Sequence, residues 1–285
     1  MSETRKEKPN SFFYVIGFQS SGTTLLSYLL DKHPDILCVT EPSVSKRIAL
    51  KQSSVLEYTS HRTITRALDF YNVDPEQYTK LVEKYLGGTL DEDSFLKESY
   101  MLLNKKKATC VGVKEACDIV MYKYDFIRKL INYHRGSIKS IFIERDIKGV
   151  VNSFIKKGYF PPGRNKLSQY NFKRFARKYI KCINYIDEHL SGNNIYCLKY
   201  EDLMQNPQKE LHEIFSIFDV DSSQEYIDKI LNTPGDGIAL KYTGIIKERS
   251  FGWKKNISRE NVVWLDELYL RKRKFISIHK PVANI

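Results

Sequence analysis

The feature that most constrains the fold is an apolar segment that runs directly into a turn rich in glycine and serine, and then into a helical pattern. The apolar segment covers Phe12–Phe18, the turn covers Gly17–Thr24, and the helical pattern covers Thr23–Lys32. Such a turn directs backbone N–H groups and the positive end of a helix dipole towards one point, and the neighbouring hydroxyl groups add further donors. The segment therefore predicts an anion-binding loop at the end of a buried strand.

The spacing of Gly17 and Gly22, with four residues between them, is that of a phosphate-binding P-loop. A nucleoside triphosphatase places a lysine directly after the second glycine, where its charge lies against the β- and γ-phosphates. Here that residue is Thr23. Its identity argues against hydrolysis of ATP or GTP and leaves open a different phosphorylated ligand. A purely structural turn is the alternative, because Gly–Ser turns before helices are common.

Short apolar segments that alternate with helical patterns predict an α/β fold with a central parallel sheet of about five strands flanked by helices. Strands are expected at Phe12–Phe18, Ile36–Val39, Thr109–Lys114, Ser140–Glu144 and Ile195–Lys199. Helices are expected at Thr23–Lys32, Tyr122–Tyr133, Lys148–Lys157, Ser168–His189 and Asn206–Phe218, with a helical insertion at 45–107 and a long loop at 233–251. We expect one domain over residues 1–285, with a flexible stretch at 1–10.

The composition of the chain limits the kinds of partner and cofactor that we expect. The net charge of +12 favours an anionic partner. The five cysteines are scattered and form no C-x-x-C pair, so we expect reduced thiols and no metal site. The chain has neither an apolar stretch of about 18 residues nor an apolar segment near Met1, so we expect no membrane span and no signal peptide. These features predict a soluble, cytoplasmic protein.

The turn and its flanks resemble the 5′-phosphosulfate loop of sulfotransferases that use 3′-phosphoadenosine-5′-phosphosulfate (PAPS). The similar residues are Ser-Gly-Thr-Thr-Leu-Leu at 21–26, followed by Asp-x-His-Pro at 31–34. Three further segments fit this family in the same order, so the resemblance extends from residue 12 to about 257. It implies a P-loop-like sulfotransferase fold and a PAPS-binding loop made of Gln19, Ser20, Ser21, Gly22, Thr23, Thr24 and Leu25.

The three further segments carry the other nucleotide-binding residues that the resemblance implies. Arg145 at a strand end, with Ser153 eight residues later, matches the family's binding pair for the 3′-phosphate. Tyr200, which begins a Tyr-Glu-Asp segment, would lie near the adenine, whereas Asp202 could equally cap the following helix. The last segment, residues 247–254, resembles the C-terminal loop with which family members close the nucleotide site, and we call it the closing segment. It contains Gly-Trp at 252–253, and its candidates for the 3′-phosphate are Lys247, Arg249 and Ser250.

Sulfuryl transfer requires a base for the acceptor hydroxyl and cations for the developing charge. Glu41 is the predicted base, because it follows the second strand as a glutamate does in some family members, and Glu115 is the second candidate. Lys114, placed at the end of the third strand, is predicted to reach the sulfuryl group or the 5′-phosphate. The family usually has Lys or Arg at the position of Ser20, so Lys114 is the first candidate to replace that charge. His33 belongs to the His-Pro turn and is expected to be structural.

The sequence thus predicts transfer of a sulfuryl group from PAPS, with its nucleotide product adenosine 3′,5′-bisphosphate (PAP), to a hydroxyl or amine without a metal. A glutamate base favours a carbohydrate or aliphatic alcohol as the acceptor. The basic residues Lys156–Lys157, Arg164 and Lys166 would suit an acidic or carbohydrate acceptor. A non-catalytic relative that binds PAPS, PAP or a polyanion is the alternative, and a P-loop kinase is a weaker one. No nucleic-acid partner is expected.

Overall fold

The structure, a computed structural model, describes residues 11–40, 75–90, 108–117, 138–157, 169–190, 195–233 and 252–273, together with Glu98 and Leu102. Several predictions lie outside these residues: the base Glu41, the helix at Tyr122–Tyr133, most of the insertion at 45–107, and the closing residues Lys247, Arg249 and Ser250.

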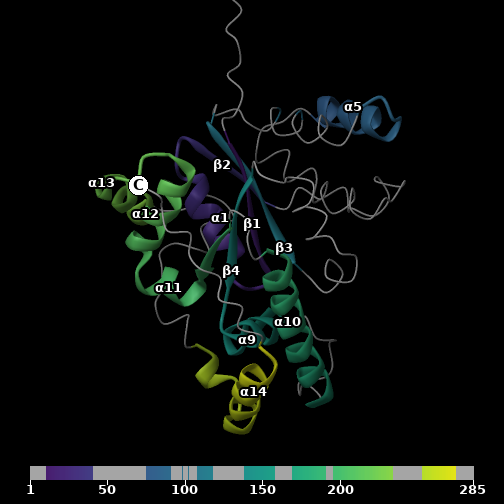
Figure 1. The fold of residues 1–285 in the computed structure, drawn as a ribbon, viewed down its shortest axis with the longest axis vertical. Coiled ribbons are helices and arrows are strands. Elements are labelled where there is room, and N and C mark those ends of the chain that lie inside the picture. The colour runs from purple at the N-terminus through teal and green to yellow at the C-terminus, as the bar shows by residue number, and fades with distance from the viewer. Residues whose placement is uncertain are drawn as a thin grey trace, which may run out of the picture.

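Five parallel strands form one sheet, as the apolar segments predicted. They are β1 (Ser11–Phe18), β2 (Ile36–Thr40), β3 (Cys110–Cys117), β4 (Ile138–Glu144) and β5 (Ile195–Lys199). The spatial order is β2-β3-β1-β4-β5, so β1 lies in the centre of the sheet (Figure 1). β1 pairs with β3 on one side and with β4 on the other, although neither follows it directly in the sequence.

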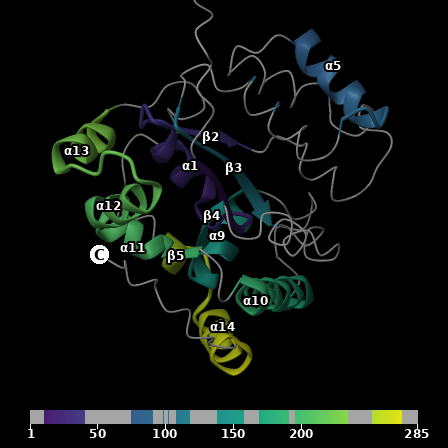
Figure 2. The ribbon, with the colours of Figure 1, turned by 45° about the horizontal axis from the view of Figure 1, so that its top comes forward.

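Helices cover both faces of this sheet (Figures 1 and 2). One face carries α1 (Thr23–Asp31), α11 (Tyr200–Gln205), α12 (Pro207–Phe218) and α13 (Gln224–Asn232). The other face carries α9 (Ile147–Lys157), α10 (Gln169–Leu190) and α14 (Arg259–Lys272), which follows the short 3-10 helix η3 (Gly252–Lys255). Helix α5 (Pro75–Leu86) lies at the opposite end of the molecule from α14. Among the described residues, no helix has the length and apolar character needed to cross a membrane.

The side chains of β1 alternate between the two faces, as the period of a strand requires. Phe13 and Val15 pack on the side of α1, whereas Tyr14, Ile16 and Phe18 pack on the side of α10. Both sets are buried, which explains why the sequence of this strand is apolar throughout instead of alternating with polar residues.

The helices that follow β1 and β4 leave these neighbouring strands towards opposite faces of the sheet. Helix α1 packs with the α12 side, whereas α9 packs with α10 and α14. In open α/β sheets, ligands bind beyond the carboxyl ends of the strands at such a switch point. The residues that follow Phe18 and Glu144 therefore occupy the part of this fold that is best placed for a ligand.

The predicted structural role of His33 is confirmed. Its buried ring accepts a hydrogen bond from the Asp35 N–H at Nδ1 (3.1 Å), and its Nε2 lies 3.0 Å from the carbonyl oxygen of Asp221. This pattern fits a ring with a hydrogen on Nε2, and the two contacts join the end of α1 to the turn between α12 and α13. The ring also packs against Phe215 and Tyr226.

Candidate functional site

The loop between β1 and α1 has the backbone geometry of an anion site. Ser20 has a φ of 71° and Gly22 a φ of 102°, both in the left-handed region, and Gly22 is the N-cap of α1. The first backbone hydrogen bond of the helix runs from the Leu26 N–H to the Gly22 carbonyl oxygen (3.0 Å). The N–H groups of residues 22–25 therefore have no acceptor within α1, and they lie at the positive end of its dipole.

Two residues of the loop carry a free-energy cost that local packing does not explain. Ser20 is a non-glycine residue in the left-handed region, which is a strained conformation that clusters at ligand clamps. The Ser21 hydroxyl is fully buried and has no hydrogen-bond partner among the described residues. A buried hydroxyl without a partner costs about 1–3 kcal/mol. Both features fit a loop whose hydrogen bonding is completed by a ligand.

Arg145 follows β4 directly and lies against this loop. Its Nη1 donates a hydrogen bond to the Ser20 carbonyl (3.1 Å), and its guanidinium carbon lies 4.1 Å from the centre of the Tyr200 ring. Tyr200 is buried and packs beneath Gly22, where an added Cβ would lie only 2.8 Å from the ring atom Cε2. The structure thus brings together the predicted loop, Arg145 and Tyr200, which follow three adjacent strands of the sheet.

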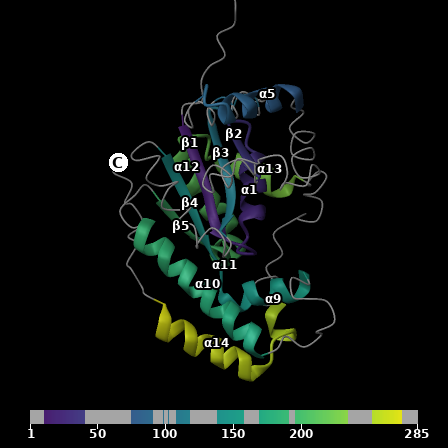
Figure 3. The same ribbon diagram turned by 90° about the vertical axis from the view of Figure 1, so that its right-hand side faces the viewer.

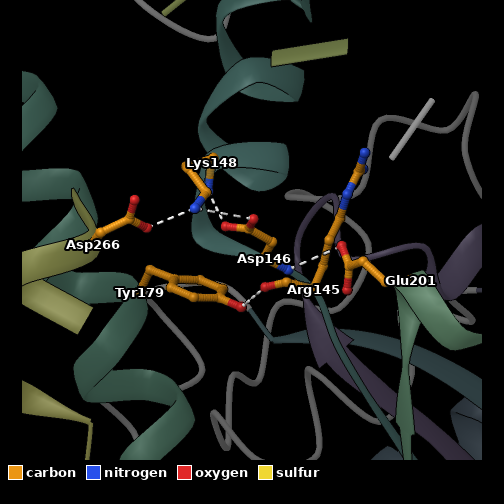
Figure 4. Close-up of polar contacts among 6 residues, drawn as sticks. All are labelled: Arg145, Asp146, Lys148, Tyr179, Glu201 and Asp266. Carbon is orange, nitrogen blue, oxygen red and sulfur yellow. Dashed lines mark hydrogen bonds and ion pairs between the residues drawn. The ribbon is translucent and has the colours of Figure 1, made fainter. Parts of the chain in front are cut away.

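The backbone beneath Arg145 is fixed by contacts from two other elements (Figure 4). The Tyr179 hydroxyl of α10 donates to the Arg145 carbonyl, and Glu201 Oε1 of α11 accepts from the Asp146 N–H (3.2 Å). Burial raises the pKa of Glu201 above its ordinary value, although its hydrogen bond from the Asp146 N–H and the nearby Arg145 act in the opposite direction. In Figure 4 the Arg145 side chain extends away from Tyr179, so the backbone is held from behind while the guanidinium faces the loop.

A second set of contacts holds the start of α9. Asp146 Oδ1 accepts from the Lys148 N–H (2.9 Å), which satisfies a donor in the first turn of the helix. The Lys148 ammonium forms ion pairs with Asp146 (3.4 Å) and with Asp266 of α14 (2.6 Å), and it lies 5.0 Å from the centre of the Trp253 ring. Burial acts to lower the pKa of Lys148, but the hydrogen bonds and charges of Asp266 and Asp146 together outweigh it and raise the pKa above its ordinary value. Trp253 therefore packs at the junction of α9 and α14.

Ser153 lies on the face of α9 that Arg145 covers. An added Cβ at Gly149 would lie 2.6 Å from Arg145 Nε, and Ser153 follows Gly149 by one helical turn. The neighbouring Asn152 is buried, and its Oδ1 accepts from Asn256 Nδ2 (2.8 Å). This bond joins α9 to the residues that follow η3, so the chain that comes after Ser250 docks beside Ser153.

One sequence-based prediction about local structure was wrong, and one alternative role is excluded. Lys114 does not end the third strand: β3 continues to Cys117, and Lys114 is buried within the sheet opposite Val15 of β1 and Thr40 of β2. The pairing with β1 extends the strand beyond its apolar residues. Asp202 does not cap the following helix, because it lies inside the short helix α11, and Asn206 is the N-cap of α12.

The sequence did not reveal which residues support Arg145 and Ser153. Tyr179 was given no role, although a tyrosine in the buried face of a helix normally places its hydroxyl against a partner. Glu201 was noted only within the Tyr-Glu-Asp segment. Asn152 and Asn256 carry no signal that distinguishes them from exposed asparagines, because their pairing depends on how α9 and η3 pack.

Comparison with known proteins agrees with this geometry. The sulfotransferase family matches residues 13–224, which include four of the strands, β1 except for its first two residues, the loop, Arg145, Ser153 and Tyr200. The match covers most of the chain, so the protein belongs to the sulfotransferase family. A search of curated proteins finds no match.

Solved structures share the fold at low sequence identity. The sulfotransferase domain from the olefin synthase of Synechococcus PCC 7002 is 17% identical with a TM-score of 0.56, and the alignment covers 94% of this chain and 98% of that domain. The sulfotransferase domain from the curacin biosynthetic pathway is 16% identical with a TM-score of 0.59, covering 95% and 100%. The mouse sulfotransferase SULT7A1, solved in complex with PAP, is 13% identical with a TM-score of 0.55, covering 92% and 84%.

Proposed function

We propose that this protein transfers a sulfuryl group from PAPS to a hydroxyl of an acceptor. The observation that carries the proposal is the convergence of three groups at the switch point between β1 and β4. These groups are the amino end of α1, the Arg145 guanidinium and the Ser21 hydroxyl, which has no hydrogen-bond partner in the part of the chain that the structure describes. Their chemistry suits a ligand with phosphate groups and does not require a nucleoside triphosphate, because Thr23 replaces the lysine of a triphosphatase.

The residues of the site divide naturally between the two anionic ends of such a nucleotide. The loop residues 19–25, with their N–H groups and hydroxyls, would hold the 5′-phosphosulfate. Arg145 and Ser153 would hold the 3′-phosphate, for which a planar guanidinium is well suited. Lys247, Arg249 and Ser250 would close over it, and Tyr200 would lie near the adenine. The mouse relative that binds PAP supports this choice of nucleotide through its shared fold.

PAPS supplies the sulfuryl group and a good leaving group, so the protein must position the acceptor, accept its proton and neutralise charge. We assign the base to Glu41, with Glu115 as the second candidate, and the neutralising charge to Lys114. The position of Lys114 supports this role, because Lys114 is buried and pairs with Thr40, the residue that precedes Glu41. A glutamate base fits a carbohydrate or aliphatic alcohol as the acceptor.

The first test is binding. Titration with PAP, followed by thermal unfolding, should stabilise the protein because the ligand binds only the folded chain. Arg145→Gln should lose this stabilisation, whereas Arg174→Gln, a change at an exposed arginine of α10, should retain it. Absence of stabilisation at millimolar PAP would overturn the proposal and also its non-catalytic alternative.

The second test separates an enzyme from a binding protein. The wild-type protein with labelled PAPS should transfer sulfate to members of a panel of sugars and aliphatic alcohols. Lys114→Ala should bind PAP but lose turnover, and Lys209→Ala, an exposed lysine on α12, is the control. Normal turnover by Lys114→Ala with intact binding would refute the role of Lys114. Binding of PAP without transfer to any acceptor would favour the non-catalytic alternative.

A further inference from the structure

Helix α10 carries an uninterrupted group of cations on its outer side. The group, called here the α10 basic face, consists of Lys173, Arg174, Arg177, Lys178 and Lys181, and no acidic residue occurs anywhere in 169–186. Arg174, Arg177 and Lys181 are exposed, and the two remaining lysines are partly exposed. Within the described ranges, none of the five forms an ion pair, although Lys173 lies 5.3 Å from the centre of the Trp264 ring.

This arrangement weakens the helix that carries it. Like charges that are three or four residues apart on a helix repel one another, and Arg174 faces both Arg177 and Lys178 in this way. Other helices of the protein use the same spacing for attraction. Ion pairs join Lys80 to Glu76 in α5, Lys209 to Glu213 in α12, and Arg271 to Glu267 in α14. Stability of the isolated protein therefore gives no reason for the composition of the α10 basic face.

The opposite side of the helix packs in the core, so the backbone positions that carry the cations are fixed. The opposite side of α10 buries Phe172, Phe175, Tyr179 and Ile183. Helix α14 lies along one flank, where Asn184 Nδ2 donates to the Lys272 carbonyl (2.7 Å) (Figure 3). From the helical rise, residues 173–181 span about 12 Å with at least one cation in each turn of about 5.4 Å. The Cα atoms that carry the cations thus form a row along the helix axis.

We propose that the α10 basic face binds a linear acidic polysaccharide, at a surface separate from the nucleotide site. A polymer with carboxylate or sulfate groups repeated along its length can contact a row of cations one after another. The two arginines suit these groups, because a guanidinium binds oxyanions through two parallel hydrogen bonds. The proposal concerns binding at this surface and does not require the polysaccharide to be the sulfated acceptor.

Two other polyanions fit the surface less well. A helix that docks on a membrane combines basic residues with exposed apolar ones, but the large apolar residues of α10 are buried or partly buried where the structure describes them. Proteins that bind single-stranded nucleic acids place aromatic rings beside the cations so that bases can stack. On α10, Phe172, Phe175 and Tyr179 are buried in the core, and Tyr185 is partly buried against it. The ring beside Lys173, that of Trp264 on α14, is partly buried and packs against Phe172.

The location of the face relative to the nucleotide site gives the proposal a functional consequence. Tyr179, on the inner side of the same helix, donates its hydroxyl hydrogen bond to the Arg145 carbonyl. A helix with its side chains is about 10–12 Å across, so a chain bound on the outer side lies within a few sugar units of the switch point. Binding at α10 would therefore concentrate a polysaccharide, or a molecule attached to it, near the proposed site of transfer.

The test uses the full-length chain and fluorescent heparin oligosaccharide as the probe, with anisotropy measured at several salt concentrations. Charge reversal of the face by Arg174→Glu, Arg177→Glu and Lys181→Glu together should weaken binding on the order of tenfold or more, because ionic contacts to a polyanion are lost. The matched control reverses three lysines on other helices, Lys80→Glu, Lys209→Glu and Lys229→Glu, which changes the net charge equally. The control should bind heparin within about threefold of the wild type, since its α10 basic face is intact.

The outcomes are decisive in each direction. Equal loss in the two triple variants would mean that only net charge matters and would overturn the proposal, as would failure of the wild-type protein to bind heparin. Tighter binding to phosphatidylserine vesicles or to an oligothymidylate than to heparin would assign the face to a different partner and would also overturn it. Thermal stabilisation by PAP, measured on the same variants, should be unchanged, so failure of this proposal is distinguishable from failure of the nucleotide site.

Discussion

The contact between Gly22 and Tyr200 allows the geometry of the loop to be tested by adding one methyl group. Gly22→Ala places a Cβ on a residue with a φ of 102°, in the region that disfavours every residue with a side chain. The new Cβ would also meet the Tyr200 ring, with Cε2 only 2.8 Å away. Tyr200 is buried between the loop and Arg145, so its ring cannot move aside freely.

The expected loss of stability has two parts. The left-handed backbone costs an alanine about 1–2 kcal/mol, and forced repacking of a buried ring costs about 1–3 kcal/mol. The free energy of unfolding should therefore fall by about 2–5 kcal/mol in Gly22→Ala. Gly88 provides a matched control, because it has a φ of 72° but no atom within 4 Å of an added Cβ. Gly88→Ala should lose only the backbone part, about 1–2 kcal/mol.

Urea denaturation followed by circular dichroism measures both losses, and a double-mutant cycle isolates the clash. In a Tyr200→Ala background the ring is absent, so Gly22→Ala should cost about 1–3 kcal/mol less than it does in the wild-type protein. Titration with PAP should show weaker binding for Gly22→Ala, because the N–H groups of the loop are displaced. If Gly22→Ala destabilises the protein no more than Gly88→Ala, the packing of Tyr200 against the loop has been misjudged.

Three further substitutions test the residues that hold the candidate site in position. Tyr179→Phe removes the donor to the partly buried Arg145 carbonyl and should lower the free energy of unfolding by about 1–3 kcal/mol; an unchanged urea midpoint would contradict this. Burial raises the pKa of Glu201 above its ordinary value of 4.5. As the pH rises, the unfolded chain therefore loses this proton before the folded protein does, and the wild-type protein loses stability between the two pKa values. Glu201→Gln should flatten the loss in melting curves above about pH 4.5, whereas parallel curves would refute it. Asn152→Ala removes the hydrogen bond to Asn256. It should weaken PAP binding, measured by titration, more than it lowers the free energy of unfolding, measured by denaturation. A PAP affinity equal to that of the wild type would show that this bond does not position the closing segment.

The sequence alone predicted the elements whose signals are contiguous. All five strands were expected close to their observed bounds, because strands buried on both faces leave short apolar runs. The loop was also predicted, because a strand, a turn with glycine and a helix follow one another directly. The third strand was predicted to end too early, since its last residues are held by pairing with β1 and not by their own apolar character.

Helices α13 and α14 were not predicted. Helix α14 buries only Leu265 and Leu268, so its apolar pattern is weak, and it is stabilised by contacts with α9 and α10. The short helix α11 spans six residues and follows β5 immediately, which leaves little sequence signal of its own. These elements depend on tertiary packing, which overrides local preference.

From the sequence we could predict that a glycine- and serine-rich loop with the pattern of an anion site follows a buried strand, and that Arg145 and Tyr200 follow two others. That these residues lie together follows from the tertiary fold and not from any local signal. Arg145 donates to Ser20, 125 residues away, because β4 pairs with β1 in the middle of the sheet. Strand order is set by how whole elements pack together, and no short segment encodes it. The same holds for Tyr179, Glu201 and Asn152, whose partners lie on elements distant in the chain.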